Sequence, residues 1–199
     1  MPNRDPIYPA REDSLLLVPF ARVPRGTSLL EIGAGSGIAA LTAARSGARV
    51  VATDRNPHAL QRLRAAAGAE GLDLETVRTD LARGLGRFDR ILANPPYLPT
   101  LPSERDPDRW HNLALDGGPD GTTTTDRVVE QFSEHLAPHA SAYLVGSSLQ
   151  DARAVQRILQ RWRARGGREE IVASRRLEGE RLEVRRFTLV SGSVADPST

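Results

Sequence analysis

Short apolar segments alternate along this chain with longer segments in which apolar residues recur at helical spacing. Four segments with apolar residues have the length of strands: residues 29–32, 50–53, 74–79 and 88–93. Helical patterns follow the first two. One is rich in alanine and ends at Gly47, and the other begins at Asn56-Pro57, a typical helix cap. This alternation predicts βα units and therefore an α/β domain built on a parallel sheet.

The pattern resumes after a long interruption. Residues 94–125 are rich in Pro, Gly and Asp and show no periodicity, and a loop of that length inside a compact domain is usually functional. Within it, Trp110-His111 could line a substrate groove or could simply anchor the loop. A helix is expected next, to about Leu136, with Pro138 as its stop. An amphipathic helix that ends at Gly166-Gly167 and three more strands complete the pattern, the last two strands as a hairpin-like edge: residues 142–146, 170–177 and 181–190.

Composition excludes several chemistries. The 199 residues, 39% hydrophobic and 26% charged, suit one globular domain. Cysteine is absent, which rules out disulfides, thiolate metal sites and cysteine nucleophiles. All 27 basic residues are arginine, which rules out a Schiff-base or P-loop lysine. The N-terminus lacks a signal peptide's apolar core, and the apolar run at 15–18 is too short to span a bilayer, so we expect a cytoplasmic protein without a membrane segment.

A glycine-rich turn, Glu31-Ile-Gly33-Ala-Gly35-Ser-Gly37, follows the first predicted strand. Glycines at a strand-to-helix turn let a ligand approach the backbone and the N-terminal amides of the helix. The third glycine comes one residue too early for a dinucleotide fingerprint. The turn therefore predicts a ligand site of another kind.

Acidic residues close the next two strands. Asp54 is placed to accept hydrogen bonds from two ribose hydroxyls, and Asp80 lies where an adenine amino group could be read. Together with Glu31 and the glycine turn, these strand ends predict a site for S-adenosylmethionine. The alternative is a nucleotide-free doubly wound fold in which Asp54 and Asp80 only cap loops.

Asn94-Pro95-Pro96-Tyr97 directly follows the fourth strand, at the edge where open α/β sheets bind ligands. The Asn94 side-chain oxygen and the Pro95 carbonyl can accept the two hydrogens of a planar amino group, and the Tyr97 ring can pack against the target. Neither proline donates a competing N–H, and their fixed φ angles keep the carbonyls aimed. The motif predicts methylation of a planar nitrogen. The alternative is a rigid Asx–Pro turn.

The glycine turn and the NPPY motif together resemble class I methyltransferases that act on adenine N6 or on the glutamine amide. Residues 7–16, IYPAREDSLL, resemble the N-terminal segment of the short archaeal and eukaryotic release-factor glutamine methyltransferases. Residues 94–99 and 115–121 resemble that family's NPPYLP and GGxDG loop, and residues 180–184 resemble its last-strand signature. The resemblance spans about residues 7–190.

This resemblance implies a Rossmann-like three-layer sandwich with a seven-stranded, mostly parallel sheet whose last strand is antiparallel. The expected domains are an N-terminal segment over the cofactor site (1–28), the methyltransferase core (29–190) and a frayed tail (191–199). The implied reaction transfers methyl from S-adenosylmethionine to a protein glutamine amide, with the GGQ motif of a translation release factor as the expected substrate. In the family's short members, a small zinc-binding activator subunit covers apolar surface.

The motifs and the resemblance assign the site residues. Cofactor contacts are expected at Ser14, Glu31, Gly33, Gly35, Gly37, Asp54, Asp80 and Asn94. The substrate amide is expected at Asn94, Pro95, Pro96 and Tyr97, of which Asn94, Pro95 and Tyr97 are the candidate catalytic residues. Tyr8 and Pro9 are adjacent where the family has an intervening residue, which leaves a contact from Tyr8 open.

Charge distribution bears on the substrate. Residues 94–126 carry six acids against two arginines, whereas residues 153–186 carry eleven arginines against five glutamates. An acidic rim opposes phosphate contacts and suits a basic peptide, so a nucleic-acid substrate is not favoured. The cluster at Arg161, Arg163, Arg165 and Arg168 is interpreted as the solvated side of a helix, with RNA contact as the alternative.

Two other functions stay open. Adenine N6 methylation of DNA or RNA shares the NPPY geometry and predicts a basic groove near Asn94. A non-catalytic binding subunit with the methyltransferase fold would have no physical need for the complete set of acidic and amide residues. No metal site is expected, because Pro138 should end the helix between His135 and His139.

Overall fold

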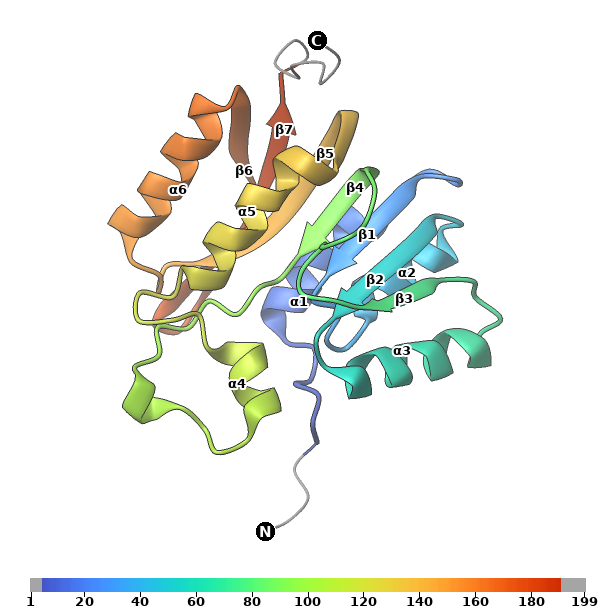
Figure 1. The fold of residues 1–199 in the computed structure, drawn as a ribbon, viewed down its shortest axis with the longest axis horizontal. Coiled ribbons are helices and arrows are strands. Elements are labelled where there is room, and N and C mark those ends of the chain that lie inside the picture. The colour runs from blue at the N-terminus through green and yellow to red at the C-terminus, as the bar shows by residue number, and fades with distance from the viewer. Residues whose placement is uncertain (1–4, 191–199) are drawn as a thin grey trace.

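The computed structural model describes residues 5–190, which form one seven-stranded sheet between two layers of helices (Figure 1). The strands lie in the order β3-β2-β1-β4-β5-β7-β6. Their bounds are β1 Ser28–Ile32, β2 Arg49–Asp54, β3 Glu75–Arg78, β4 Phe88–Ala93, β5 Leu136–Ser147, β6 Gly167–Leu177 and β7 Glu180–Leu189. β1 to β5 are parallel, and β7 is antiparallel to both of its neighbours, which confirms the predicted fold class.

The helices of the described residues are α1 Glu12–Leu17, α2 Ile38–Arg45, α3 Pro57–Ala69, α4 Arg109–Leu115, α5 Thr123–His135 and α6 Ala152–Ala164, with short 3₁₀ turns η1 Val18–Ala21 and η2 Pro102–Glu104. The sequence pattern predicts α2, α3, α5 and α6, but not α1 or α4. The predicted cap of α3 is confirmed, because the Asn56 side chain accepts the His58 backbone N–H at 3.0 Å. None of the helices in residues 5–190 is long and apolar enough to cross a bilayer.

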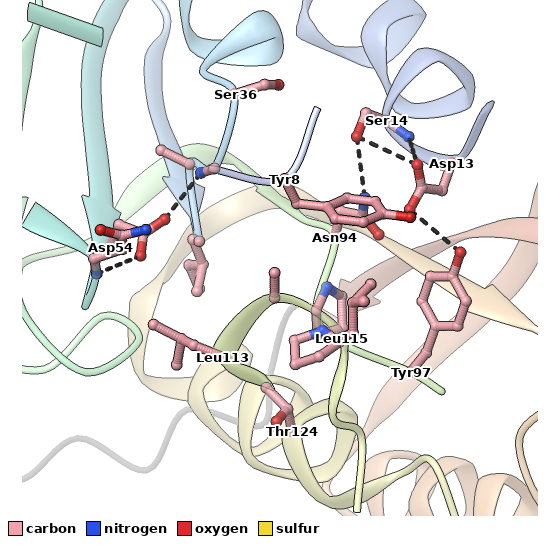
Figure 2. A pocket seen from close by; sticks show the side chains of 18 of the residues that line it. Tyr8, Asp13, Ser14, Ser36, Asp54, Asn94, Tyr97, Leu113, Leu115 and Thr124 are labelled. Carbon is pink, nitrogen blue, oxygen red and sulfur yellow. Dashed lines mark hydrogen bonds between the residues drawn. The ribbon is translucent and has the colours of Figure 1, made fainter. Parts of the chain in front are cut away.

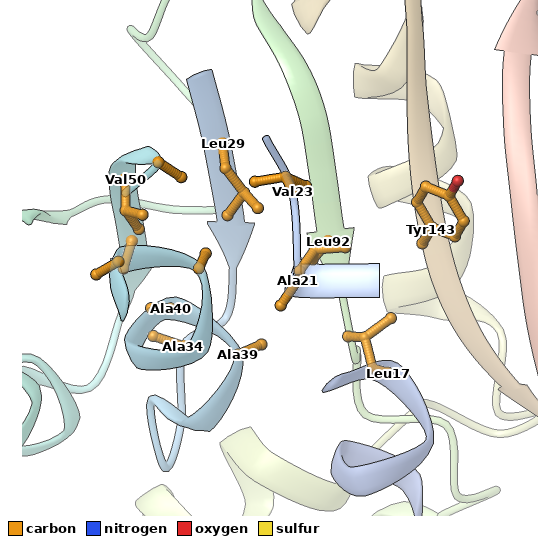
Figure 3. Packing of buried hydrophobic residues seen from close by; sticks show 14 of the residues in the cluster. Leu17, Ala21, Val23, Leu29, Ala34, Ala39, Ala40, Val50, Leu92 and Tyr143 are labelled. Carbon is orange, nitrogen blue, oxygen red and sulfur yellow. The ribbon is translucent and has the colours of Figure 1, made fainter. Parts of the chain in front are cut away.

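Two hydrophobic clusters cover the two faces of the sheet. On one face, the alanines of α2 let the helix lie close to the strands, with Ala39 and Ala40 packed near Leu29 and Val50 (Figure 3). On the other face, three aromatic rings from α5, α6 and β7 meet with centroids 5.3 to 6.3 Å apart: Phe132, Trp162 and Phe187. This packing fixes the helices and leaves the carboxyl edge of the sheet for the site.

The predicted end of this helix near Leu136, with Pro138 just beyond it, is confirmed, but the predicted start of the fifth strand was wrong. The helix ends at His135, and the fifth strand already begins at Leu136 rather than at Ala142. The β4–β5 pairing shifts its register between Phe88 and Arg90, so residues 137–140 form a bulge in which His139 has a φ of +63°. A bulge tolerates proline because the ladder needs no N–H there.

The long loop also differs from its prediction, because it contains η2 and the seven-residue α4. Asp108 caps α4 by accepting the Trp110 N–H at 2.8 Å. Two turns are too short to produce a recognisable hydrophobic period, which explains why the pattern showed none.

The N-terminal segment is part of the core. Leu17 and Ala21 are fully buried against the sheet. Phe20 stacks on the Tyr143 ring at 4.6 Å, and Arg90 donates to the Phe20 carbonyl at 3.0 Å while its guanidinium lies over the same ring. A domain boundary at residue 28 stays a prediction, and the frayed tail predicted at 191–199 lies outside the described residues.

Candidate active site

A pocket of about 720 Å³ opens at the carboxyl edge of β1, β2 and β4. Its size is that of a typical small-ligand site. The N-terminal segment, the glycine turn, the ends of β2 and β3, the NPPY motif and α4 all contribute to its wall (Figure 2). Every residue predicted to contact the cofactor or the substrate amide lines this pocket except Gly37, and Tyr8 lines it as well.

Gly37 has a packing role instead of a place in the pocket wall. Its φ is +77°, and a Cβ there would lie 2.7 Å from the Leu63 side chain of α3. Gly33 and Gly35 form the ligand-facing part of the turn, with φ values of +73° and +50° that favour glycine. The Gly35 N–H donates to the Asp54 carboxylate at 2.9 Å, so the turn is tied to the end of β2.

Glu31 is buried below the glycine turn, with 6% of its surface exposed. One carboxylate oxygen accepts the Ala40 backbone N–H at 2.8 Å, which ties the first turn of α2 to β1. Burial, together with the charge of Asp54, raises the pKa of Glu31 to about 8. At neutral pH this side chain is therefore mostly protonated.

This buried acid predicts how stability depends on pH. Between about pH 5 and pH 8 the folded protein keeps a proton on Glu31 that the unfolded chain releases, so the free energy of unfolding should fall as pH rises through that window. The shift from 4.5 to about 8 sets an upper bound of roughly 5 kcal/mol. In Glu31→Gln the amide still accepts the Ala40 N–H, so the difference from wild type should grow with pH. Urea unfolding of both cofactor-free proteins at several pH values checks this, and parallel curves would contradict it.

Asp54 has its carboxylate in a mixed environment. Burial raises its pKa, whereas the N–H groups of Asn56 and Gly35 act in the opposite direction. The two contacts are 2.7 and 2.9 Å long. A carboxylate has about four acceptor positions, so these two bonds leave capacity for hydroxyl donors from a ligand.

Asp80 presents an acceptor without a protein partner. One oxygen pairs with Arg127 of α5 at 2.5 Å, while Oδ1 is buried and receives no hydrogen bond. The next residue, Leu81, has a φ of +57°, which is uncommon for a residue with a side chain, and it lines the same pocket. A buried acceptor left without a donor costs roughly 1–3 kcal/mol, which a ligand N–H in this pocket would offset.

The NPPY motif contains the second such acceptor. Asn94 donates through Nδ2 to the Ser14 hydroxyl at 3.3 Å, and its Oδ1 is buried without a hydrogen-bond partner. At the other end of the motif, the Tyr97 hydroxyl donates to Asp13 at 3.2 Å (Figure 2). Burial and the negative charges of Asp13 and Glu180 raise the pKa of Tyr97, so the phenol stays protonated.

The glycines of the GGxDG segment pack directly on the NPPY motif. In the sequence, this segment was notable only for its resemblance to the family's loop. The Gly117 N–H donates to the Leu98 carbonyl at 2.9 Å. A Cβ on Gly117 would lie 2.8 Å from the Tyr97 backbone carbon, and one on Gly121 would lie 2.4 Å from the Tyr97 carbonyl oxygen. Buried Gln150 fixes the segment from behind by donating to the Gly121 carbonyl at 2.8 Å. Only glycine lets these two loops approach so closely.

Both interpretations of Trp110-His111 describe part of the structure. Trp110 lines the pocket and also meets the His58 ring of α3 edge-on, with centroids 5.8 Å apart. His111 lies 5.8 Å from the Tyr8 ring and contacts Asp106 at 3.0 Å. The loop helix α4 therefore closes the pocket toward α3 and the N-terminal segment.

The predicted acidic rim is partly neutralised. Arg105 pairs with Asp116 and Arg161 pairs with Asp126, so two acids of the segment are compensated. The negative field persists beside Tyr97, where Asp13 and Glu180 act.

In residues 5–190, no group of three or more His, Asp or Glu side chains could hold a metal ion. His135 is instead buried, with its Nδ1 2.9 Å from the Gly86 carbonyl.

The fold and this pocket define a class I methyltransferase. A family model described as methyltransferase small domain matches residues 12–107. A solved structure, described as the E. cuniculi Mtq2-Trm112 complex responsible for methylation of the eRF1 translation termination factor, has the same fold. It superposes with a TM-score of 0.71 at 23% identity, over 93% of this chain and 99% of that one.

Sequence relatives narrow the class. A Methanocaldococcus jannaschii protein named as an N5-glutamine methyltransferase is 34% identical over 72% of this chain and 73% of its own length. Mouse Methyltransferase HEMK2 is 32% identical over 92% and 89%. The Deinococcus radiodurans release factor glutamine methyltransferase is 37% identical over 76% of this chain, which spans only 59% of that longer protein. The chain belongs to the protein glutamine N5-methyltransferase family.

Proposed function

We propose that this protein transfers a methyl group from S-adenosylmethionine to the side-chain amide nitrogen of a glutamine, in the GGQ motif of a translation release factor. One observation carries the proposal. Asn94 presents a buried oxygen with no protein donor directly before two prolines that have no N–H. This arrangement accepts the hydrogens of a planar amino group and offers it no competing donor.

The pocket fits the cofactor at its other end. Gly33 and Gly35 expose backbone to a ligand, Asp54 has acceptor capacity for ribose hydroxyls, and Asp80 Oδ1 is an unpartnered acceptor for the adenine amino group. Ser14, Glu31 and Asn94, the other side chains predicted to contact the cofactor, line the same pocket. When bound, S-adenosylmethionine supplies an electrophilic methyl group.

The protein contributes positioning and no nucleophile. The Asn94 oxygen and the Pro95 carbonyl accept the two N–H hydrogens, and Tyr97 packs against the amide plane. The amide nitrogen would gain the methyl group as the methyl–sulfur bond breaks, with S-adenosylhomocysteine as the leaving group, and would release one proton to solvent. Alignment of this kind supplies up to roughly 7–11 kcal/mol in favourable cases, which is consistent with a chain that lacks both cysteine and lysine.

The relatives support the substrate and the compartment. The D. radiodurans protein is named for release factors, and the E. cuniculi enzyme is described as acting on eRF1. A release factor acts in translation, so the proposal places the activity in the cytoplasm. Because the E. cuniculi enzyme is described in complex with Trm112, a small activator subunit is the corresponding partner.

Labelled S-adenosylmethionine tests this function. The protein is incubated separately with purified release factor, with the same factor carrying alanine in place of the motif glutamine, and with bulk RNA and DNA. We expect label only in the release factor that keeps its motif glutamine, because the glutamine amide is the methyl acceptor. Label confined to nucleic acid would establish adenine methylation instead, and full activity of the chain alone would remove the activator from the proposal.

A further inference from the structure

Both ends of the NPPY motif contact the same two neighbouring residues of α1. Asn94, the first residue of the motif, donates from Nδ2 to the Ser14 hydroxyl at 3.3 Å. Tyr97, the last, donates from its hydroxyl to Asp13 Oδ2 at 3.2 Å (Figure 2). These contacts join residues that lie 80 and 84 positions apart in the sequence.

The two α1 residues are themselves connected. Asp13 Oδ1 accepts the Ser14 backbone N–H at 2.6 Å and lies 3.4 Å from the Ser14 hydroxyl, which donates to it. The carboxylate can only accept, so the lone pairs of the Ser14 hydroxyl remain for Asn94. The Asn94 NH₂ group therefore faces Ser14, and Asn94 Oδ1 is the atom turned away from it, buried and without a partner.

The contacts on Tyr97 follow the same logic. Burial and the charges of Asp13 and Glu180 hold its hydroxyl in the protonated form, so it donates to Asp13 and cannot exchange roles with it. The α1 helix is anchored below by Leu17, 2% exposed, and at its side by the Glu12–Arg175 ion pair of 2.5 Å. Because α1 is held in place, Asp13 and Ser14 hold the two ends of the NPPY motif in fixed positions.

We propose that Asp13 and Ser14 are positioning residues that set the amide orientation of Asn94 and the ring position of Tyr97. The inference rests on the proposed function, since orientation matters only if Asn94 accepts a substrate N–H. With Ser14 removed, the Asn94 amide can rotate by half a turn and present its NH₂ group to the substrate amino group. Two donors then face each other, and the aligned geometry is lost.

Ser14→Ala and Ser14→Thr form the test pair, with Leu15→Ala as the control on the same helix. Leu15 is 46% exposed and lies outside the pocket wall. We expect Ser14→Ala to lower kcat on release factor at least tenfold at saturating cofactor, with less than a threefold change in KM for the factor. Ser14→Thr keeps the hydroxyl and should restore kcat to within threefold, and Leu15→Ala should leave it unchanged.

Three results would overturn the inference: an unchanged kcat in Ser14→Ala, a loss fully explained by weaker cofactor binding in calorimetry, or no recovery in Ser14→Thr. All three results presuppose that the wild-type protein methylates release factor. If the wild-type protein is inactive on release factor, that result counts against the proposed function and not against this inference.

A second readout does not depend on turnover. The Asn94 side-chain amide resonance is identified in ¹H–¹⁵N spectra by its absence in Asn94→Ala. Its hydrogen exchange should accelerate at least tenfold in Ser14→Ala and stay unchanged in Leu15→Ala. Equal exchange in all proteins would overturn the positioning role even if the folded variants lack activity.

Discussion

Asn94→Ala is expected to lower the single-turnover rate of methyl transfer by about 100-fold or more, while the Kd for S-adenosylmethionine changes only a few-fold. Removing one preorganised hydrogen-bonding group from an active site typically costs 10²–10³ in rate, about 3–4 kcal/mol. The Asn94 oxygen has no protein partner to lose, so folding should be little affected. Rapid-quench kinetics and calorimetry separate the two quantities.

The thermal midpoint of Asn94→Ala is the control for folding. It should lie within a few degrees of the wild-type value, since only the 3.3 Å bond to Ser14 is lost. A variant that binds cofactor and turns over at the wild-type rate would remove Asn94 from the mechanism and favour the rigid-turn interpretation of the motif.

Gly121→Ala should damage both stability and activity. The φ of Gly121 is +73°, and the new methyl would lie 2.4 Å from the Tyr97 carbonyl oxygen, a backbone atom that cannot rotate away. Left-handed backbone strain and overpacking together should cost about 2–4 kcal/mol. Because the displaced atom belongs to the NPPY motif, kcat should fall at least tenfold in the fraction that remains folded. Urea unfolding and methyl-transfer assays measure the two effects.

Gly71→Ala is the matched control. Its φ of +65° imposes similar strain, but a Cβ there has nothing within 4 Å. We expect a loss of about 1–2 kcal/mol from strain alone and normal kcat. If Gly121→Ala and Gly71→Ala have the same loss of stability and the same kcat, the close approach of Gly121 to Tyr97 does not contribute to activity.

The central strands were predictable because each carries a short apolar stretch that is buried in the sheet, such as Leu29-Leu30 in β1 and residues 91–93 in β4. The predicted strand at residues 88–93 coincides with β4, and the cap at Asn56 follows from local chemistry. The start of β5 was not predictable, because the bulge around Pro138 depends on how β4 pairs with it. Local propensity carries no information about that register.

The site was also predictable only in part. The positions of its residues in the chain could be predicted, because strand ends, glycine turns and the NPPY motif are local patterns. The contacts of these residues could not be predicted, because they join distant segments: Glu31 with Ala40, Asp80 with Arg127 and Tyr97 with Asp13. Asp13 lies in the segment IYPAREDSLL, and no feature of its spacing indicated that it would contact Tyr97.

The position of β7 has a consequence for when the enzyme becomes active. This strand is the last of the sheet in sequence, yet it lies between β5 and β6 and pairs with both. Two of its residues, Glu180 and Leu182, also form part of the pocket wall. A nascent or truncated chain that stops before residue 180 therefore has an open β5 edge and an open substrate site together. We expect catalytic competence only once residues 180–189 have been synthesised and have paired with β5 and β6.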